Sequence, residues 1–484
     1  MNREAWGCLL VRKFLMVTAL LCLVCGMSAS QTLTTLKHQP PDGAILTLQL
    51  TDGTVMAQGN EESDWWKLTP DDTGSYVNGT WTKLASLPSG YVPDAFASAV
   101  LADGRLIIEG GEYNSGNFAL TNQGAIYDPS SNTWTSVKPP AGWDYIGDSP
   151  ALVLPSGQFL IGDKLTTEMA ALDPNTLTWH AVSSTGKSDF NAEEGWTLLP
   201  NGTVLTADVL DAPNSEIYTP SAGAWATAGS TIVDLRSPSP FGCIHYGPDG
   251  SLCYYPPGEI GPAILRPDGT VFATGSYTDT GDGPGNTAIY SPTTGWSAGP
   301  VFPNGDNAGD SFAVLLTNGD VLVEGDTGTS YVFNGTTFTP GPAVPGSLMV
   351  LPTGQILVGG TEVYESTGTY LPAWAPAIRS VPATVVRGST YKISGTQFNG
   401  LSQANAFGDE FQTATNYPLV RITNNSTGHV FYARTHGHST MGVATGKKLV
   451  STNFDVPASM ETGASSLVVV ANGIPSQAVS ITVN

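Results

Sequence analysis

The chain has 484 residues, and its 41 acidic residues against 19 basic ones give a net charge of −22. This charge repels nucleic acid and anionic lipid, so we exclude both as partners. The 56 glycines and 35 prolines are typical of a turn-rich all-β protein, and the length allows two or three domains.

Residues 1–30 predict a secretory signal peptide. Basic residues precede an apolar run from Phe14 to Cys25, which is too short to span a bilayer comfortably. The small residues Ser28-Ala29-Ser30 follow and predict cleavage near Ser30. We expect a secreted, periplasmic or extracellular protein with no membrane attachment after cleavage; an uncleaved anchor is the alternative.

Residues 31–369 repeat one unit seven times. Each copy has an apolar strand, a tight turn ending in Gly and a second apolar strand, as in LADGRLIIEGG (101–111) and LPNGTVLTAD (199–208). Asp-Gly and Asn-Gly favour tight hairpins. One sheet of about 45–50 residues cannot bury both faces, whereas seven packed radially can. The repeat therefore predicts a seven-bladed β-propeller, in which residues 32–38 could supply the outer strand that the seventh copy lacks.

Two cysteines remain after the signal segment, Cys243 and Cys253 in CIHYGPDGSLC. A Pro-Asp-Gly turn between two extended arms brings them across a hairpin. In an exported chain this predicts a disulfide, and a zinc site is disfavoured because no second cysteine pair accompanies them.

The pattern changes from about residue 370. A proline-rich linker is followed by short alternating segments such as TYKISG, PLVRITN and SSLVVVAN. Short alternating strands over about 110 residues are typical of an Ig-like β-sandwich, which we predict for residues 370–484.

The tail segments ARTHGHST (433–440) and STNFDVPASMETGASSLVVVANGIPSQAVSITV, together with the repeat, resemble the galactose oxidase family of secreted copper radical oxidases. The resemblance implies a kelch-type seven-bladed propeller followed by an Ig-like early-set domain. It also implies that Thr435-His436 stands where the family has its copper-ligating histidine, on a loop that reaches up the propeller channel. His438 is the alternative, on the same strand face.

The family's radical residues do not carry over. Its Tyr-His position falls at Val344-Pro345, its cysteine position at Ala95, and its second tyrosine position near Gly147-Asp148, with Tyr145 close by. We therefore do not expect copper chemistry. The cofactor is otherwise open, and a divalent cation fits the acids described next.

Carboxylates occupy the same frame of the repeat. Four of them stand six residues before the reference leucine of their blade: Asp148, Glu193, Glu259 and Asp310. Asp94 stands seven before, and Glu194 neighbours Glu193. Blade symmetry should aim these side chains toward one mouth of the propeller.

Several interpretations of this ring stay open. With imidazole it could hold a divalent cation, or crowding could raise one pKa and give a general acid for glycan cleavage. It could bind the hydroxyls or an amine of a sugar, or be only a solvated acidic rim. Trp196 could stack on a sugar or pack in the core.

We favour an exported, monomeric propeller that binds a carbohydrate or small molecule. The alternative is a secreted carbohydrate-active hydrolase or lyase that uses the carboxylates and a histidine. In either case we predict that His436, or His438, enters the channel, faces Asp148, Glu193, Glu259 and Asp310, and has a raised pKa.

Overall fold

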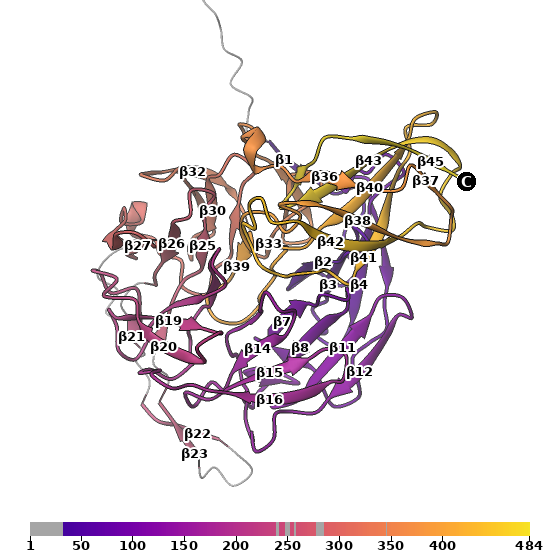
Figure 1. The fold of residues 1–484 in the computed structure, drawn as a ribbon. Helices are drawn as coiled ribbons and strands as arrows, with labels where there is room; N and C mark the ends of the chain where they lie inside the picture. The colour runs from indigo at the N-terminus through magenta and orange to yellow at the C-terminus, as the bar shows by residue number, and fades with distance from the viewer. Residues whose placement is uncertain (1–31, 239–241, 247–251, 256–257, 277–284, 345) are drawn as a thin grey trace, which may run out of the picture. The chain divides into compact units, whose positions relative to one another are not determined.

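The computed structural model describes residues 32–238, 242–246, 252–255, 258–276, 285–344 and 346–484 (Figure 1). Its regular structure is strand, apart from two 3-10 helices, η1 (Pro303–Gly305) and η2 (Pro372–Trp374). The described part of the chain has no helix long and apolar enough to cross a membrane. The predicted all-β class is confirmed.

Seven antiparallel sheets of the described residues follow one another along the chain and form the blades of the propeller. From the innermost strand outward, the first three blades are β2 (Thr47–Gln49), β3 (Val55–Gln58), β4 (Trp65–Thr69) and β5 (Thr80–Lys83); β7 (Ala97–Val100), β8 (Leu106–Glu109), β11 (Gly124–Asp128) and β12 (Thr133–Val137); β13 (Ala151–Val153), β14 (Phe159–Gly162), β15 (Met169–Asp173) and β16 (Thr178–Val182).

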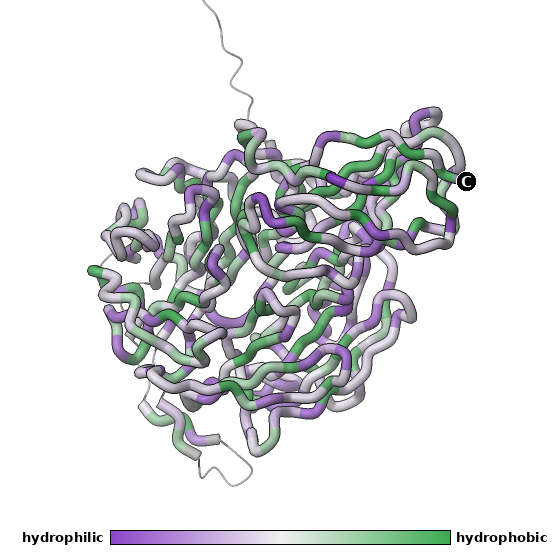
Figure 2. The backbone as a smooth tube through the Cα atoms, in the orientation of Figure 1, coloured by the Kyte–Doolittle hydropathy of each residue, from purple (hydrophilic) through white to green (hydrophobic). Residues whose placement is uncertain are grey.

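The next three blades have the same order. They are β17 (Thr197–Leu198), β18 (Val204–Ala207), β19 (Ser215–Thr219) and β20 (Ala224–Thr227); β25 (Ala263–Leu265), β26 (Val271–Thr274), β27 (Thr287–Ser291) and β28 (Gly295–Ala298); β29 (Ala313–Leu315), β30 (Val321–Glu324), β31 (Thr329–Phe333) and β32 (Phe338–Ala343). Strands β8 and β14 are buried along their whole length, and Figure 2 shows hydrophobic residues concentrated along the blade strands.

The seventh blade joins the two ends of the propeller. It contains β33 (Leu348–Val350), β34 (Ile356–Val358), β35 (Glu362–Glu365) and, as its outer strand, β1 (Thr32–Thr35). Thr32 lies opposite Glu365 in an antiparallel pair. The predicted closure by the N-terminal segment is confirmed, and it covers an edge that β35 would otherwise expose.

The tryptophan that ends most repeats packs across two strands. Trp134 lies opposite Tyr127 with ring centroids 5.2 Å apart, and Trp225 lies opposite Tyr218 at 5.3 Å. Cross-strand aromatic pairs stabilise a sheet by their contact area and ring geometry. The periodic tryptophans therefore hold the outer strands of the blades.

Short strands connect some of the blades. They are β6 (Pro93–Asp94), β9 (Tyr113–Asn114) and β10 (Asn117–Phe118); β21 (Ser237–Pro238) and β24 (Gly258–Glu259); β22 (Ile244–Tyr246) and β23 (Leu252–Tyr254). A disulfide joins Cys243 and Cys253 across the β22–β23 hairpin, with Cα atoms 5.3 Å apart. The predicted disulfide is confirmed.

The C-terminal strands form one sheet path of their own. They are β36 (Ala377–Ser380), β37 (Thr384–Val385), β38 (Thr390–Thr396), β40 (Leu419–Asn424), β41 (Val430–His436), β42 (Val450–Asp455), β43 (Gly463–Ala471), β44 (Ile474–Pro475) and β45 (Val479–Val483). Their order is β36-β38-β42-β41-β40-β43-β45-β37. Buried residues alternate along β41 and β42, and these strands enclose a separate hydrophobic cluster that includes Ile393, Val420 and Phe454.

The C-terminal domain contacts the Gly-turn end of the blades. The backbone N–H of Thr435 donates to the Thr51 carbonyl at 3.1 Å, and that of His438 to the Ala102 carbonyl at 3.0 Å. Both acceptors belong to turns between first and second strands. The acids of the repeat frame precede the first strands, so they lie at the opposite end.

One loop of the C-terminal domain runs between these two ends, and we call residues 402–416 the channel loop. Its short strand β39 (Asn405–Ala406), which Figure 1 labels among the blades, pairs with β29, the inner strand of the sixth blade. Further along, the Phe411 N–H donates to the Phe96 carbonyl at 3.0 Å. These partners lie on or beside the innermost strands of two different blades, so the loop passes along the propeller channel.

Candidate functional site

A left-handed backbone bend recurs at the repeat-frame position before the second, fourth and sixth blades. Glu193 and Asp310 adopt left-handed conformations with φ of 57° and 46°, and Ala95, at the equivalent position, has φ of 50°. The conformation is uncommon for residues other than glycine. Because Ala95 shares it, we attribute the bend to the blade architecture, which turns this residue toward the channel.

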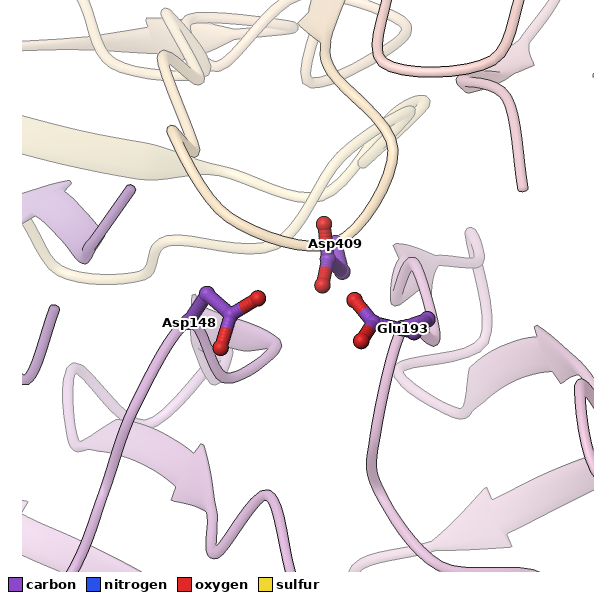
Figure 3. A group of neighbouring side chains, drawn as sticks. All are labelled: Asp148, Glu193 and Asp409. Carbon is purple, nitrogen blue, oxygen red and sulfur yellow. The ribbon is translucent and has the colours of Figure 1, made fainter. Parts of the chain in front are cut away.

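Three carboxylates from separate parts of the chain meet in the channel. Ligand oxygens of Asp148, Glu193 and Asp409 all lie within 4.8 Å of one another, and all three residues are buried. Figure 3 shows Asp148 and Glu193 on two propeller loops, with Asp409 reaching them from the channel loop. The frame predicted the first two positions, and Asp409 had no signal in the repeat.

The buried ammonium of Lys164 pairs with this group. Lys164 follows β14, and its Nζ contacts Asp148 and lies 2.6 Å from Glu193 Oε1. The Tyr254 hydroxyl donates to Glu193 Oε1 at 3.1 Å, and the Tyr254 ring centroid lies 5.7 Å from Nζ. A fully buried lysine is rare unless carboxylates compensate its charge.

A second set of carboxylates continues from Asp409 toward solvent. Oxygens of Asp310, Asp409 and Glu410 lie within 4.8 Å of one another, and Asp310 is exposed. Beyond the effect of burial, the charge of Asp310 raises the pKa of Glu259 at this end, and the charge of Asp409 acts in the same way on Glu193 and Glu410. Among the described residues, the cation that pairs with these acids is Lys164, and its partners are Asp148 and Glu193. The set formed by Asp310, Asp409 and Glu410 therefore has no positively charged partner of its own among the described residues.

The surroundings favour protonated carboxyls. Burial raises the pKa of Asp148 to about 7, although Lys164 opposes the shift. Burial and then the Asp148 charge raise the pKa of Glu112 to about 7. Burial raises the pKa of Glu259, and the charges of Glu193 and Asp310 raise it further. Burial also raises the pKa of Glu410, and the charge of Asp409 adds to that shift. Like charges this close cannot all ionise at neutral pH, so the cluster holds protons or a bound cation.

The two predicted histidines lie elsewhere. His436 Nε2 is 3.1 Å from Asp455 Oδ1 on the neighbouring β42. His438 is buried, with Nδ1 2.9 Å from Thr452 Oγ1 and its ring stacked on Tyr417. The prediction that either faces the carboxylates is wrong, because the loop that enters the channel is residues 402–416. Burial also lowers the pKa of His438 to about 3, opposite to the predicted direction.

Asp94, Tyr145 and Trp196, which were also predicted as ligand-binding residues, differ in burial and in what they contact. Asp94, in β6, is half-buried and adds negative charge beside Glu112. Tyr145 is half-buried against a small cluster that contains Leu120 and Tyr254. Trp196 is buried with its ring centroid 6.0 Å from that of Trp225. Sugar stacking on Trp196 is therefore ruled out by its core packing.

Glu194 does not face the channel with its neighbour Glu193. Its carboxylate lies 2.7 Å from Lys187 Nζ, in a separate buried group with Glu216. The residues that sequence reasoning missed are Lys164, Asp409 and Glu410. Lys164 lies outside the repeat frame, and the acidic pair at 409–410 stands in a non-repeating loop, so periodicity could locate neither.

No family model and no curated protein sequence matches the chain. A solved fungal alcohol oxidase of the AA5 family, in complex with copper, superimposes with a TM-score of 0.50 at 14% identity, over 94% of this chain and all of the other.

Two further structures overlap less closely. An inactive virginiamycin B lyase from Staphylococcus aureus with quinupristin has a TM-score of 0.46 at 9% identity, over 69% of this chain and 98% of that one. The extracellular domain of a candidate one-component system from B. thetaiotaomicron has a TM-score of 0.47 at 10% identity, over 94% and 58%. The likeness to the alcohol oxidase, together with the blade order, shows that this chain has a galactose oxidase-like β-propeller fold.

Proposed function

We propose that this protein is an exported binding protein whose propeller channel takes a small ligand with both an ammonium group and hydroxyls, such as an amino sugar. One observation carries the proposal. Among the described residues, the channel cluster has one ammonium group, that of Lys164, which pairs with two carboxylates, while the cluster contains six: Asp148, Glu193, Glu259, Asp310, Asp409 and Glu410.

The contacts of Lys164 illustrate the recognition that we propose. Its ammonium has two carboxylate partners, and the ring of Tyr254 lies within cation–π range. An ammonium group placed at Asp310, Asp409 and Glu410 would gain the same charge-assisted hydrogen bonds. A neutral sugar offers no positive charge to replace the protons that these crowded carboxyls otherwise hold, so the charge balance favours a cationic ligand.

Exposed aromatic side chains stand close in the sequence to Glu193 of the cluster and to its neighbours Glu112 and Tyr254. Tyr113 (38% exposed) follows Glu112, Phe190 (47%) precedes Glu193 by three residues, and Tyr255 (67%) follows Tyr254. Aromatic rings offer apolar faces with polar edges, which suits the apolar face of a sugar ring. They support a hydroxyl-bearing ring as the rest of the ligand.

The donor set of the cluster does not fit a copper radical site. Among the described residues its ligand groups are carboxylates, while His436 and His438 bind within the C-terminal domain and the two cysteines are joined. Copper favours imidazole and thiolate ligands. We infer that the chain does not carry out copper radical oxidation. An oxygen-only set suits a hard divalent cation, which is the competing occupant in the test below.

Export is part of the same proposal. The Cys243–Cys253 disulfide is typical of oxidising compartments, and it agrees with the predicted signal peptide at residues 1–30. The proposed location is therefore extracellular or periplasmic, where free glycans and amino sugars are accessible to a binding protein.

The test is calorimetric titration of the full chain with glucosamine and galactosamine, with glucose and galactose, and with Ca²⁺. We expect the amino sugars to bind and the neutral sugars not to, and Asp310→Asn to abolish binding. Asp94→Asn, which changes a nearby acid outside the cluster, is the matched control and should retain it. Equal binding of neutral and amino sugars, or binding of Ca²⁺ alone, would contradict the proposal.

A catalytic role is the second candidate, because two acids of the site titrate near neutral pH. The pKa values of Glu112 and Asp148 both lie at about 7, and Glu112 is half-buried beside the exposed Tyr113. A carboxyl of this kind suits a general acid in glycan cleavage. New reducing ends or unsaturated products from a glycan panel, lost in Glu112→Gln, would favour a hydrolase or lyase.

A further inference from the structure

A second group of buried acids lies in the fourth blade, apart from the channel cluster. Glu194 precedes β17, Asp208 follows β18, and Glu216 lies in β19. One ligand oxygen from each lies within 4.8 Å of the others, and their exposed fractions are 0, 3 and 2%. The proposed ligand site does not involve these side chains.

Glu194 and Glu216 are fully partnered. Lys187 Nζ lies 2.7 Å from Glu194 Oε1 and 2.8 Å from Glu216 Oε2. The second oxygens accept from Thr206 Oγ1, at 3.3 Å, and from the Ser188 N–H, at 2.8 Å. The lysine is held over the Trp225 ring at 5.0 Å. This half of the group is a satisfied ion network.

Asp208, the third acid of this group, differs from Glu194 and Glu216 in its hydrogen bonding. Both of its carboxylate oxygens are buried without a hydrogen-bond partner among the described residues, and no lysine, arginine or histidine there pairs with it. Buried polar atoms without partners are rare, and each one points to a bound water, ion or other group. An oxygen of Asp208 faces those of Glu194 and Glu216, so the missing partner belongs between them.

We propose that a hard divalent cation, with Ca²⁺ the best match, binds at Asp208, with Glu194 and Glu216 bridging it to Lys187. Ca²⁺ takes oxygen ligands at about 2.3–2.6 Å, so ligands on opposite sides of the ion lie about 5 Å apart. The separation of these oxygens, within 4.8 Å, matches that spacing.

The excess of negative charge around Asp208 also favours a bound cation. The buried Asp189, which accepts from the Leu210 N–H at 2.7 Å, brings the local carboxylates to four against one lysine. A divalent ion reduces the excess to a single negative charge. The site ties the loop before β17 to β18 and β19, so the ion stabilises the fourth blade and does not depend on the channel ligand.

A proton is the competing occupant, because burial raises the pKa of Asp208 to about 7 and that of Glu194 to about 8. The test uses the full chain at pH 8, treated with EDTA and then titrated with Ca²⁺ or Mg²⁺, with Tm and bound metal both measured. We expect Ca²⁺ to raise Tm by about 1–3 °C at a hundredfold excess over its Kd. The Ca²⁺-dependent rise should vanish in Asp208→Asn and persist in Asp310→Asn.

The proposal also predicts how Asp208→Asn changes Tm when no metal is present. In EDTA at pH 8, Asp208→Asn should have a higher Tm than the unmodified chain, because it removes an uncompensated buried charge. A Ca²⁺ response that is equal in Asp208→Asn and the unmodified chain would overturn the proposal. The proposal would also be overturned if the unmodified chain bound no Ca²⁺ and its Tm rose only when the pH was lowered. That result would identify a proton as the occupant of the site.

Discussion

Two histidines one residue apart in the sequence have different surroundings. His436 is partly exposed and contacts Asp455, whereas His438 is buried between Tyr417 and Thr452. Without a carboxylate beside it, His438 has no compensation for a buried positive charge. Burial therefore keeps its imidazole neutral and lowers its pKa to about 3.

This makes His438 a source of acid sensitivity. Its pKa is 6.5 in the unfolded reference and about 3 in the folded protein. Its neutral form is fully compatible with folding above pH 6.5, and stability falls as the pH drops below that value because the unfolded chain binds the proton, by about 1.4 kcal/mol per pH unit. Denaturant unfolding between pH 4 and 8 should show a shallower decline for His438→Gln. Identical slopes would contradict the assignment.

Lys164 provides a second test at this scale. Its side chain is completely buried with Asp148 and Glu193, so Lys164→Met leaves buried carboxylates without a cation and should cost about 3–5 kcal/mol. Lys83, whose side chain is 50% exposed, pairs with Asp64 on the surface, and Lys83→Met should cost about 0–1 kcal/mol. Similar losses of unfolding free energy in the two variants would show that the buried network contributes little.

At the scale of elements, the channel loop has the largest influence on the candidate site. It carries Asp409 and Glu410 into the propeller, and aromatic packing holds it there. The ring of Phe411 lies 5.3 Å from that of Phe96 and 5.5 Å from that of Phe407, in edge-to-face arrangements. Its backbone pairs with β29 at β39.

Removing the central ring of this packing should loosen the loop. Phe411 is 7% exposed, and Phe411→Ala should lower the free energy of unfolding by about 3–5 kcal/mol. Phe190→Ala is the matched control, because its ring is 47% exposed and surface changes usually stay within about 0.5 kcal/mol. Urea denaturation measures both. A loss below about 1 kcal/mol in Phe411→Ala would show that the loop does not depend on this ring.

At the scale of the whole molecule, the propeller and the C-terminal domain share part of their core. Residues 31–484 form one compact unit. The Tyr417 hydroxyl donates to the Gln49 carbonyl, and the Leu198 N–H donates to Gln403 Oε1 at 2.8 Å. Inner strands of two blades therefore have partners on the channel loop or on Tyr417, the residue that follows it.

We expect the chain to unfold as one cooperative unit for this reason. A chain that ends at residue 369 would leave apolar channel residues such as Phe96 and Phe312 without their partners on the loop. Scanning calorimetry of the full chain should show a single transition, and the shortened chain should be poorly soluble or unfold at a much lower temperature. Two separate transitions, with a stable propeller fragment, would contradict this expectation.

The repeat predicted the seven blades and the positions of Asp148, Glu193, Glu259 and Asp310 at one end of them, and it indicated that the N-terminal segment could close the ring. These features depend on local turn chemistry and on a period-two strand pattern, which every blade repeats. The Cys243–Cys253 hairpin was predictable for the same local reason.

Only the tertiary structure decided which loop of the C-terminal domain reaches the acids. That choice depends on where the domain docks on the Gly turns, through contacts such as Thr435 with Thr51 that join residues hundreds of positions apart. The docking leaves His436 and His438 at the Gly-turn end and sends Asp409 and Glu410 through the channel. Non-local packing, which has no period in the sequence, thus determined the chemistry of the site, because it alone sets which side chains share one buried volume.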